Sequence, residues 1–179
     1  MRIGEGQISG VLSTFLAVLC LGSVICFHFP QHFTTSEFRA AYPVEVLRWV
    51  LLVCLILAYA FALSSFLLRG KNKLALLGVI LTTGAILLGG STVTIEETEQ
   101  SIFAISLDWL LIDTLVLSAI FIPLELFLPQ RSEQTKFHRE WKTDLVYFAI
   151  AHLFVQFTAV AVKSPAESLF SGWGLEGLQ

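Results

Sequence analysis

Three stretches of the chain carry no Asp, Glu, Lys or Arg over a length that matches the thickness of a lipid bilayer. They run from Ile8 to Phe29, from Trp49 to Leu68 and from Leu74 to Ile95. About 20 apolar residues in a helix cross roughly 30 Å of hydrocarbon, because each residue adds about 1.5 Å. The sequence therefore predicts an all-α fold, a multi-pass transmembrane helical bundle.

Two further apolar stretches contain polar residues. Asp113, Pro123 and Glu125 lie in the stretch from Trp109 to Leu128, and His152 and Gln156 lie in the stretch from Leu145 to Val162. Counting both gives about five helices, and we expect residues 1–179 to form a single membrane domain. Its spans are approximately 8–29, 49–68, 74–95, 109–128 and 145–162.

The composition agrees with a protein whose main partner is the lipid bilayer. Charged residues make up 14% of the chain and the mean hydropathy is +0.77, whereas soluble domains contain about 25% charged residues. The net charge of −3 carries no information on nucleic acid, and we expect no nucleic-acid partner, since no basic patch with interleaved aromatics appears outside the fourth connection. The first stretch is long for a signal peptide and no small-residue cleavage site follows it, so we expect a retained helix.

The basic residues predict the orientation, since Lys and Arg near span ends stay on the cytoplasmic side. With five spans, eight basic residues fall on the side of the N-terminus: Arg2, Arg69, Lys71, Lys73, Arg131, Lys136, Arg139 and Lys142. The other side has three, Arg39, Arg48 and Lys163. We expect a membrane protein with a cytoplasmic N-terminus.

Short connections and small residues predict how some helices pack. The tight turn from Arg69 to Lys73 makes the second and third spans an antiparallel hairpin. Small residues on one face of the third span allow a neighbouring helix to approach closely; they are Ala75, Gly78, Thr82, Ala85 and Gly89. The three cysteines lie inside spans without metal-ligand spacing, so we interpret them as small apolar residues.

Ionisable residues within a span are costly and are candidates for function. On a helical wheel Asp113 is rotated about 140° from Asp108, and Glu125 about 120° further. These carboxylates share no face, which argues against an ion pathway. We expect Asp108 near the membrane interface and Asp113 to need a partner inside the bundle.

The fifth span carries a polar stripe, which we define as His152, Gln156 and Lys163. At about 100° per residue these three fall within about 40° of one another. Such a stripe faces protein or a water-filled cleft, and we favour interhelical hydrogen bonds over the wall of an active site.

Neither a metal site nor a catalytic motif is evident. His28 and His32 have the spacing of a helical metal pair, but Pro30 separates them and no third ligand follows closely. We expect interfacial residues there. No phosphate loop, nucleophile elbow or C-x-x-C is present, so we expect no catalytic, cofactor-binding or metal-binding residue in this chain.

One region resembles a known family. The residues that carry the resemblance end one span and begin the next, and they are Pro123, Glu125, Pro129, Arg139, Trp141, Asp144, Leu145 and Tyr147. In this pattern the chain resembles the membrane segment ahead of the catalytic region in bacterial members of the sterol desaturase and fatty acid hydroxylase superfamily. The resemblance covers the last third of the chain well, and the first hundred residues only as generic spans. Because it is to bacterial members, it implies a bacterial inner-membrane protein.

The resemblance implies a lipid oxidoreductase whose di-iron cofactor is held by histidine clusters and activates dioxygen. Those clusters normally lie beyond the region that this chain matches, so no metal ligand is carried over. We expect a fragment or truncated member that is inactive alone and meets a lipid substrate only with the missing region present. The alternatives are a non-catalytic membrane scaffold, with self-association, or a small transporter or channel subunit.

Overall fold

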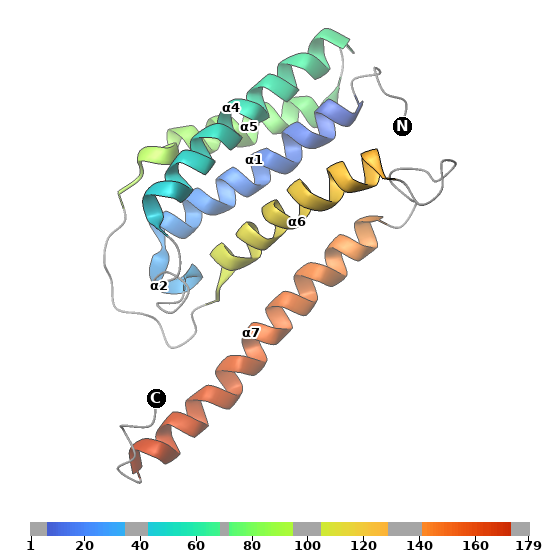
Figure 1. The fold of residues 1–179 in the computed structure, drawn as a ribbon. Helices are drawn as coiled ribbons and strands as arrows, with labels where there is room; N and C mark the ends of the chain where they lie inside the picture. The colour runs from blue at the N-terminus through green and yellow to red at the C-terminus, as the bar shows by residue number, and fades with distance from the viewer. Residues whose placement is uncertain (1–6, 35–42, 69–71, 95–104, 129–140, 173–179) are drawn as a thin grey trace. The chain divides into compact units, whose positions relative to one another are not determined.

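The computed structural model describes residues 7–34, 43–68, 72–94, 105–128 and 141–172, and these residues are helical except for short connections, with no strand among them (Figure 1). The helices follow in the order α1 (Gln7–His28), α2 (Pro30–Phe33), α4 (Val44–Leu68), α5 (Lys73–Leu87), the 3-10 turn η1 (Gly90–Thr92), α6 (Leu107–Phe127) and α7 (Trp141–Gly172). The predicted all-α class is confirmed.

Four of these segments are long and apolar enough to cross a membrane. They are Ile8–His28, Val44–Leu68, Lys73–Thr92 and Leu107–Leu124, close to the first four predicted spans. In the fifth, the apolar part is shorter, Thr143–Thr158. The described residues thus form the helices of a multi-pass membrane protein, and a fifth crossing stays a prediction.

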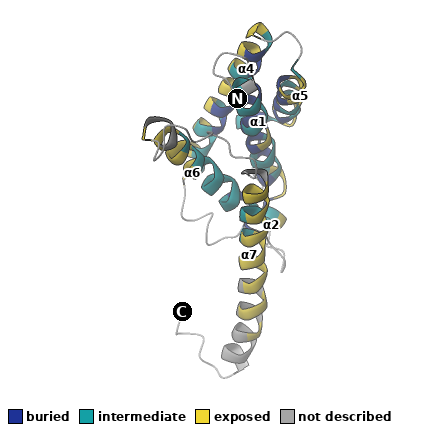
Figure 2. Ribbon diagram, turned by 90° about the vertical axis from the view of Figure 1, so that its right-hand side faces the viewer, coloured by how far each residue is buried: buried dark blue, intermediate teal, exposed yellow. Residues whose placement is uncertain are grey.

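The described helices belong to two compact units with a boundary between His138 and Arg139. The first unit contains α1 to α6 and the second contains α7. Within the first unit α1 packs against both α4 and α5, and α4 and α5 also contact each other. These three helices hold most of the buried residues (Figure 2).

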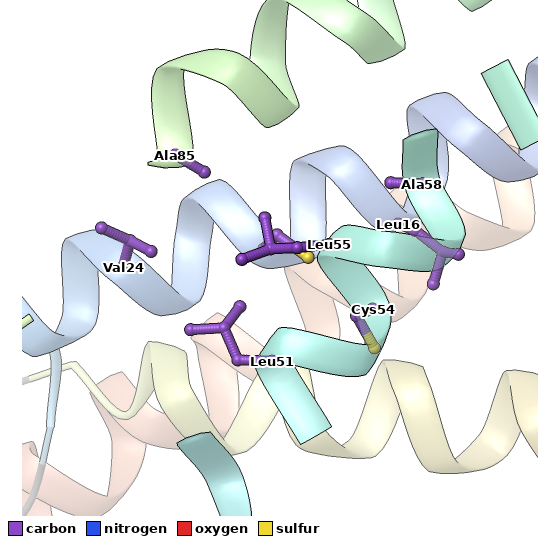
Figure 3. Close-up of a cluster of buried hydrophobic side chains, with 8 residues drawn as sticks. Leu16, Val24, Leu51, Cys54, Leu55, Ala58 and Ala85 are labelled. Carbon is purple, nitrogen blue, oxygen red and sulfur yellow. The ribbon is translucent and has the colours of Figure 1, made fainter. Parts of the chain in front are cut away.

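The core of the three-helix bundle consists of small and medium apolar side chains. Leu16, Cys20 and Val24 come from α1, and Leu51, Cys54, Leu55 and Ala58 from α4, with Ala85 from α5 (Figure 3). Cys20, Cys26 and Cys54 are buried free thiols, as expected of small apolar residues.

The small face of α5 is buried, as its spacing predicted. Ala75, Gly78, Thr82 and Ala85 are all buried, and a Cβ placed on Gly78 would overlap Ser13 Oγ and lie 3.1 Å from Ser13 Cβ. Gly89 has a different role, because its φ of 107° is left-handed and lets the chain turn into η1. Close approach of α1 to α5 therefore depends on the missing side chain at Gly78.

Polar side chains hold the hairpin of α4 and α5 together at the turn predicted between Arg69 and Lys73. Asn72 caps α5 by accepting a 3.1 Å hydrogen bond from Leu74 N, and its Nδ2 donates to Ser65 Oγ at 2.7 Å. Thr14 of α1 donates to the Leu74 carbonyl at 2.6 Å. All three helices are thus joined where α5 begins.

Two basic side chains hold the opposite end of α5. Arg48 of α4 donates to the carbonyl oxygens of Ser91 at 2.8 Å and Val93 at 2.7 Å. His28 Nε2, at the end of α1, lies 2.6 Å from the Leu88 carbonyl oxygen. The positive charge of Arg48 suits this end of the helix because the helix dipole is negative there.

Helix α6 joins the bundle through α1 and α2. Ile105 N, just before α6, donates to the His32 carbonyl at 2.8 Å. Further along, Leu111 lies against Gly22 of α1, where a Cβ would come within 3.0 Å of Leu111 Cδ1. The beginning of α6 is therefore fixed at the end of the bundle where α1 ends and α4 begins.

Helix α7 is continuous over 32 residues, through Pro165 and past the predicted end at Val162. At about 1.5 Å per residue it is about 48 Å long, whereas the hydrocarbon core is about 30 Å thick. A single upright crossing would leave part of α7 outside the hydrocarbon.

Candidate functional site

The residues that carry the family resemblance lie at the ends of two helices. Pro123 and Glu125 are in the last two turns of α6, and Trp141 is the first residue of α7. Pro123 is exposed, as are Asp144, Leu145 and Tyr147 in the first turns of α7. Pro129 and Arg139 lie outside the described residues, and for Glu125 and Trp141 only the backbone is described. The described motif residues therefore lie at the end of α6 and the start of α7, and their role stays a prediction.

Two members of the polar stripe lie on the least exposed face of α7. Between Thr143 and Thr158 the half-buried residues are Phe148, Ala149, His152 and Gln156, while the others are exposed. Phe148, His152 and Gln156 are spaced by four residues and share one face. For Lys163 only the backbone is described, as part of α7. Whether the stripe faces protein or a water-filled cleft stays a prediction.

The buried carboxylate of α6 is Asp108. Its exposed fraction is 7%, whereas Asp113 is half-buried. Asp108 is buried because the first turn of α6 is held against the bundle through the bond from Ile105 to His32. That Asp108 lies near the membrane interface and that Asp113 needs a partner inside the bundle stay predictions.

The two closely spaced histidines do not act as a helical pair. The helix breaks at Phe29, which has φ −126° and ψ 57°, so His28 ends α1 while His32 belongs to α2. His28 already contacts the Leu88 carbonyl. Among the residues that the structure describes, no group of three or more His, Cys, Asp or Glu side chains is placed to hold a metal ion.

A small cavity lies between α1, α4 and α6, and we call it the α1–α4–α6 cavity. Its volume is about 60 Å³, and it extends beside the second half of α1, the first half of α4 and the first half of α6. The lining is mainly apolar, and Asp108, Ser23 and Thr34 are its charged and hydroxyl-bearing members. The cavity lies at the end of the first unit where Arg48 and His28 hold α5.

The sequence analysis predicted neither this cavity nor the hydrogen bonds from Arg48 to the carbonyls of Ser91 and Val93. The signal for these bonds was a lone arginine directly before the predicted span 49–68, where a charge at the edge of the hydrocarbon needs polar partners. The cavity had no comparable signal, because its lining is ordinary apolar sequence.

Searches of family models, of curated proteins and of solved structures found no match to this chain. Any function assigned to the chain therefore rests on its own residues and geometry.

Proposed function

We propose that the chain is the membrane-embedded part of a lipid oxidoreductase of the sterol desaturase and fatty acid hydroxylase type. The observation that carries the proposal is the motif around the connection between α6 and α7. Its Pro-x-Glu ends one apolar helix, and its Trp141, Asp144 and Leu145 begin the next. A lipid substrate agrees with a reaction carried out at the membrane.

In this proposal the first unit anchors the protein in the membrane, and the motif residues connect it to the catalytic region. The packed bundle of α1, α4 and α5 positions the beginning of α6, whose far end carries Pro123 and Glu125. The resemblance implies that a cluster of histidines would hold iron, and His28 and His32, which lie on different helices, do not form such a cluster. Bound iron would supply the activation of dioxygen.

We also propose that the N-terminus is cytoplasmic and that the membrane is a bacterial inner membrane. Arg48 is one of only three basic residues assigned to the other side, and its bonds to Ser91 and Val93 give a structural reason for its position. Lys73, on the cytoplasmic side in this orientation, is exposed at the start of α5. Because Arg48 has this structural role, it need not count as an orientation signal. The imbalance between the two sides then supports a cytoplasmic N-terminus more strongly.

A non-catalytic scaffold is the second candidate. It is favoured by the bundle of α1, α4 and α5, whose small residues and hydrogen bonds already pack these helices without a further partner. A scaffold would need neither iron nor an oxidisable lipid.

Genomic sequence and labelled oxygen separate the two candidates. The first test is to read the gene beyond the Gln179 codon, where in-frame histidine clusters would support the oxidoreductase. The second is to grow cells with and without the gene under ¹⁸O₂ and analyse their lipids by mass spectrometry. Gene-dependent hydroxylated lipids carrying ¹⁸O, or gene-dependent unsaturation, support the proposal. A gene without histidine clusters and an unchanged lipid profile would favour the scaffold.

A further inference from the structure

The α1–α4–α6 cavity is too small for a lipid and larger than a packing defect. Pockets for drug-sized molecules occupy about 300–1,000 Å³, whereas this cavity has about 60 Å³. A single water needs about 10–15 Å³ by the same kind of measure. The space therefore suits a guest of only a few heavy atoms.

The polar groups of the lining lie mostly at one end of the cavity, where Asp108 Oδ1 is buried without a hydrogen-bond partner among the described residues. Ser23 Oγ donates to the Leu19 carbonyl in its own helix at 2.9 Å. Thr34 and Asp108, at one end of the cavity, each make a polar interaction with the protein. A buried water typically needs two to four polar partners, and apolar cavities without them stay dry and bind guests such as xenon or benzene. The stretch beside Ile112 and Leu115 supplies only hydrocarbon.

The wall contributed by α6 gives an apolar guest a route from the bilayer. Leu111, Ile112 and Leu115 line the cavity and are only half-buried. They belong to the candidate span Leu107–Leu124, so their outer side borders hydrocarbon when the span is in the membrane. Small apolar molecules concentrate in hydrocarbon because transfer out of water is favourable.

We propose that the α1–α4–α6 cavity is a binding site for a small apolar gas molecule. Its size limits the guest to a few heavy atoms, the stretch beside Ile112 and Leu115 offers water no polar partner, and its position gives access from the membrane. Under the proposed lipid oxidation the gas is dioxygen, the oxidant of that chemistry. That identity rests on the proposed function, whereas gas binding itself does not.

Xenon is the probe that tests the site. The protein would be labelled at isoleucine methyl groups, placed in lipid nanodiscs and observed by NMR under increasing xenon pressure. The Ile112 methyl, in the cavity lining, should shift along a saturable curve. The Ile80 methyl on α5, which is 57% exposed, should shift linearly because it meets only xenon dissolved in lipid.

A matched pair of serine variants locates the binding. Ser23→Leu places a larger side chain in the lining and should abolish the saturable shift of Ile112. Ser64→Leu removes the same kind of bond, from Ser64 Oγ to Ala60 O at 2.8 Å, at an exposed position on α4, and should leave saturation unchanged. If Ser23→Leu does not fold, Leu115→Ala enlarges the cavity and should increase the saturable shift.

Three results would overturn the proposal. A linear response at Ile112, or saturation that persists in Ser23→Leu, would show that xenon does not occupy the cavity. A cross-peak between the Ile112 methyl and water would show a hydrated site. Stronger relaxation of Ile112 than of Ile80 by a lipid spin-labelled near its chain end would show a lipid tail there. None of these measurements needs iron, so their outcome is independent of the proposed oxidoreductase.

Discussion

The guanidinium of Arg48 donates to the carbonyl oxygen of Val93 from 2.7 Å, and so connects the first turns of α4 to the segment that follows η1. The same guanidinium donates to Ser91, and it lies 5.9 Å from the centroid of the Phe27 ring. Arg48 of α4 therefore contacts Phe27 of α1, Ser91 of η1 and Val93 just after η1. Because Ser91 lies in η1, shortly after the end of α5 opposite Asn72, the chain is held at both ends of α5.

Replacing Arg48 by Ala should destabilise the first unit markedly. Hydrogen bonds to a charged group contribute roughly 1.5–3 kcal/mol, and Arg48 makes two of them to carbonyls that would lose their donor. We expect a loss in the free energy of unfolding of that order, measured by thermal melts in detergent or by steric trapping in bicelles.

Glu45→Gln is the control for Arg48→Ala. Glu45 lies 4.0 Å from Arg48, and its side chain is 84% exposed, so the ion pair should contribute little. Equal losses in the two variants would mean that Arg48 acts through Glu45 and not through the carbonyls of Ser91 and Val93.

Gly78→Ala should loosen the contact of α1 with α5. A methyl group at Gly78 would collide with Ser13, whose Oγ is itself bonded to the Ala58 carbonyl at 2.9 Å. Overpacking of this kind costs about 1–3 kcal/mol. Thermal melts of the purified variant should show the loss.

Gly84→Ala, on the same helix, is the matched control and should not lower the stability of the protein. Nothing lies within 4 Å of a Cβ placed there, so the usual advantage of Ala over Gly in a helix, about 0.5–1 kcal/mol, should appear as a small gain or no change. If both glycine variants lost stability equally, the close contact at Gly78 would not be the cause.

The orientation can be tested at the two ends of α5. In a background without Cys20, Cys26 and Cys54, a cysteine replacing Thr94 should react with a membrane-impermeant maleimide added outside intact cells. A cysteine replacing Lys73 should react only after the cells are opened. Both native side chains are exposed, so access to the reagent depends on the membrane side. The reverse pattern would place the N-terminus outside.

The helices and one of their interfaces could be predicted from sequence because each depends on local spacing. The length of charge-free runs follows from bilayer thickness, and Gly78 falls on a face with Ala75 and Thr82 whatever packs against it. By contrast, the cavity and the burial of Asp108 depend on where α6 meets α1. That contact is set by Gly22, Leu111 and the bond from Ile105 to His32, which no periodicity reveals.

For the candidate site, the sequence predicted only that the motif residues lie where one helix ends and the next begins. Pro123 and Trp141 fall where α6 ends and α7 begins, as the motif indicated. Their chemistry could not be derived, since a metal centre is defined by ligands converging in space, and the sequence shows no such set near the motif.

The purified 179-residue chain should bind no stoichiometric iron and oxidise no sterol or fatty acid. Its closely spaced histidines end one helix and belong to another, and His28 is engaged by the Leu88 carbonyl. Elemental analysis after purification without chelator would measure the iron. Two equivalents per chain that disappear in a His28→Ala, His32→Ala variant would contradict the expectation and would place a metal site in the first unit.

A cysteine scan along α7 should show which face meets lipid. Phe148, His152 and Gln156 are half-buried, whereas Phe154 and Phe157 are 67% and 70% exposed. Spin labels at 154 and 157 should therefore collide readily with oxygen dissolved in the bilayer, and labels at 148, 152 and 156 should not, which gives an accessibility pattern with the helical period of 3.6 residues.

Because His and Gln prefer hydrogen-bonding surroundings to hydrocarbon, the protected labels should report either protein contact or contact with a water-soluble nickel reagent. Protection from both reagents favours interhelical hydrogen bonds, and access to nickel favours a water-filled cleft. Equal oxygen access on all faces would mean that the stripe faces lipid in this chain, contrary to the role predicted for His152 and Gln156.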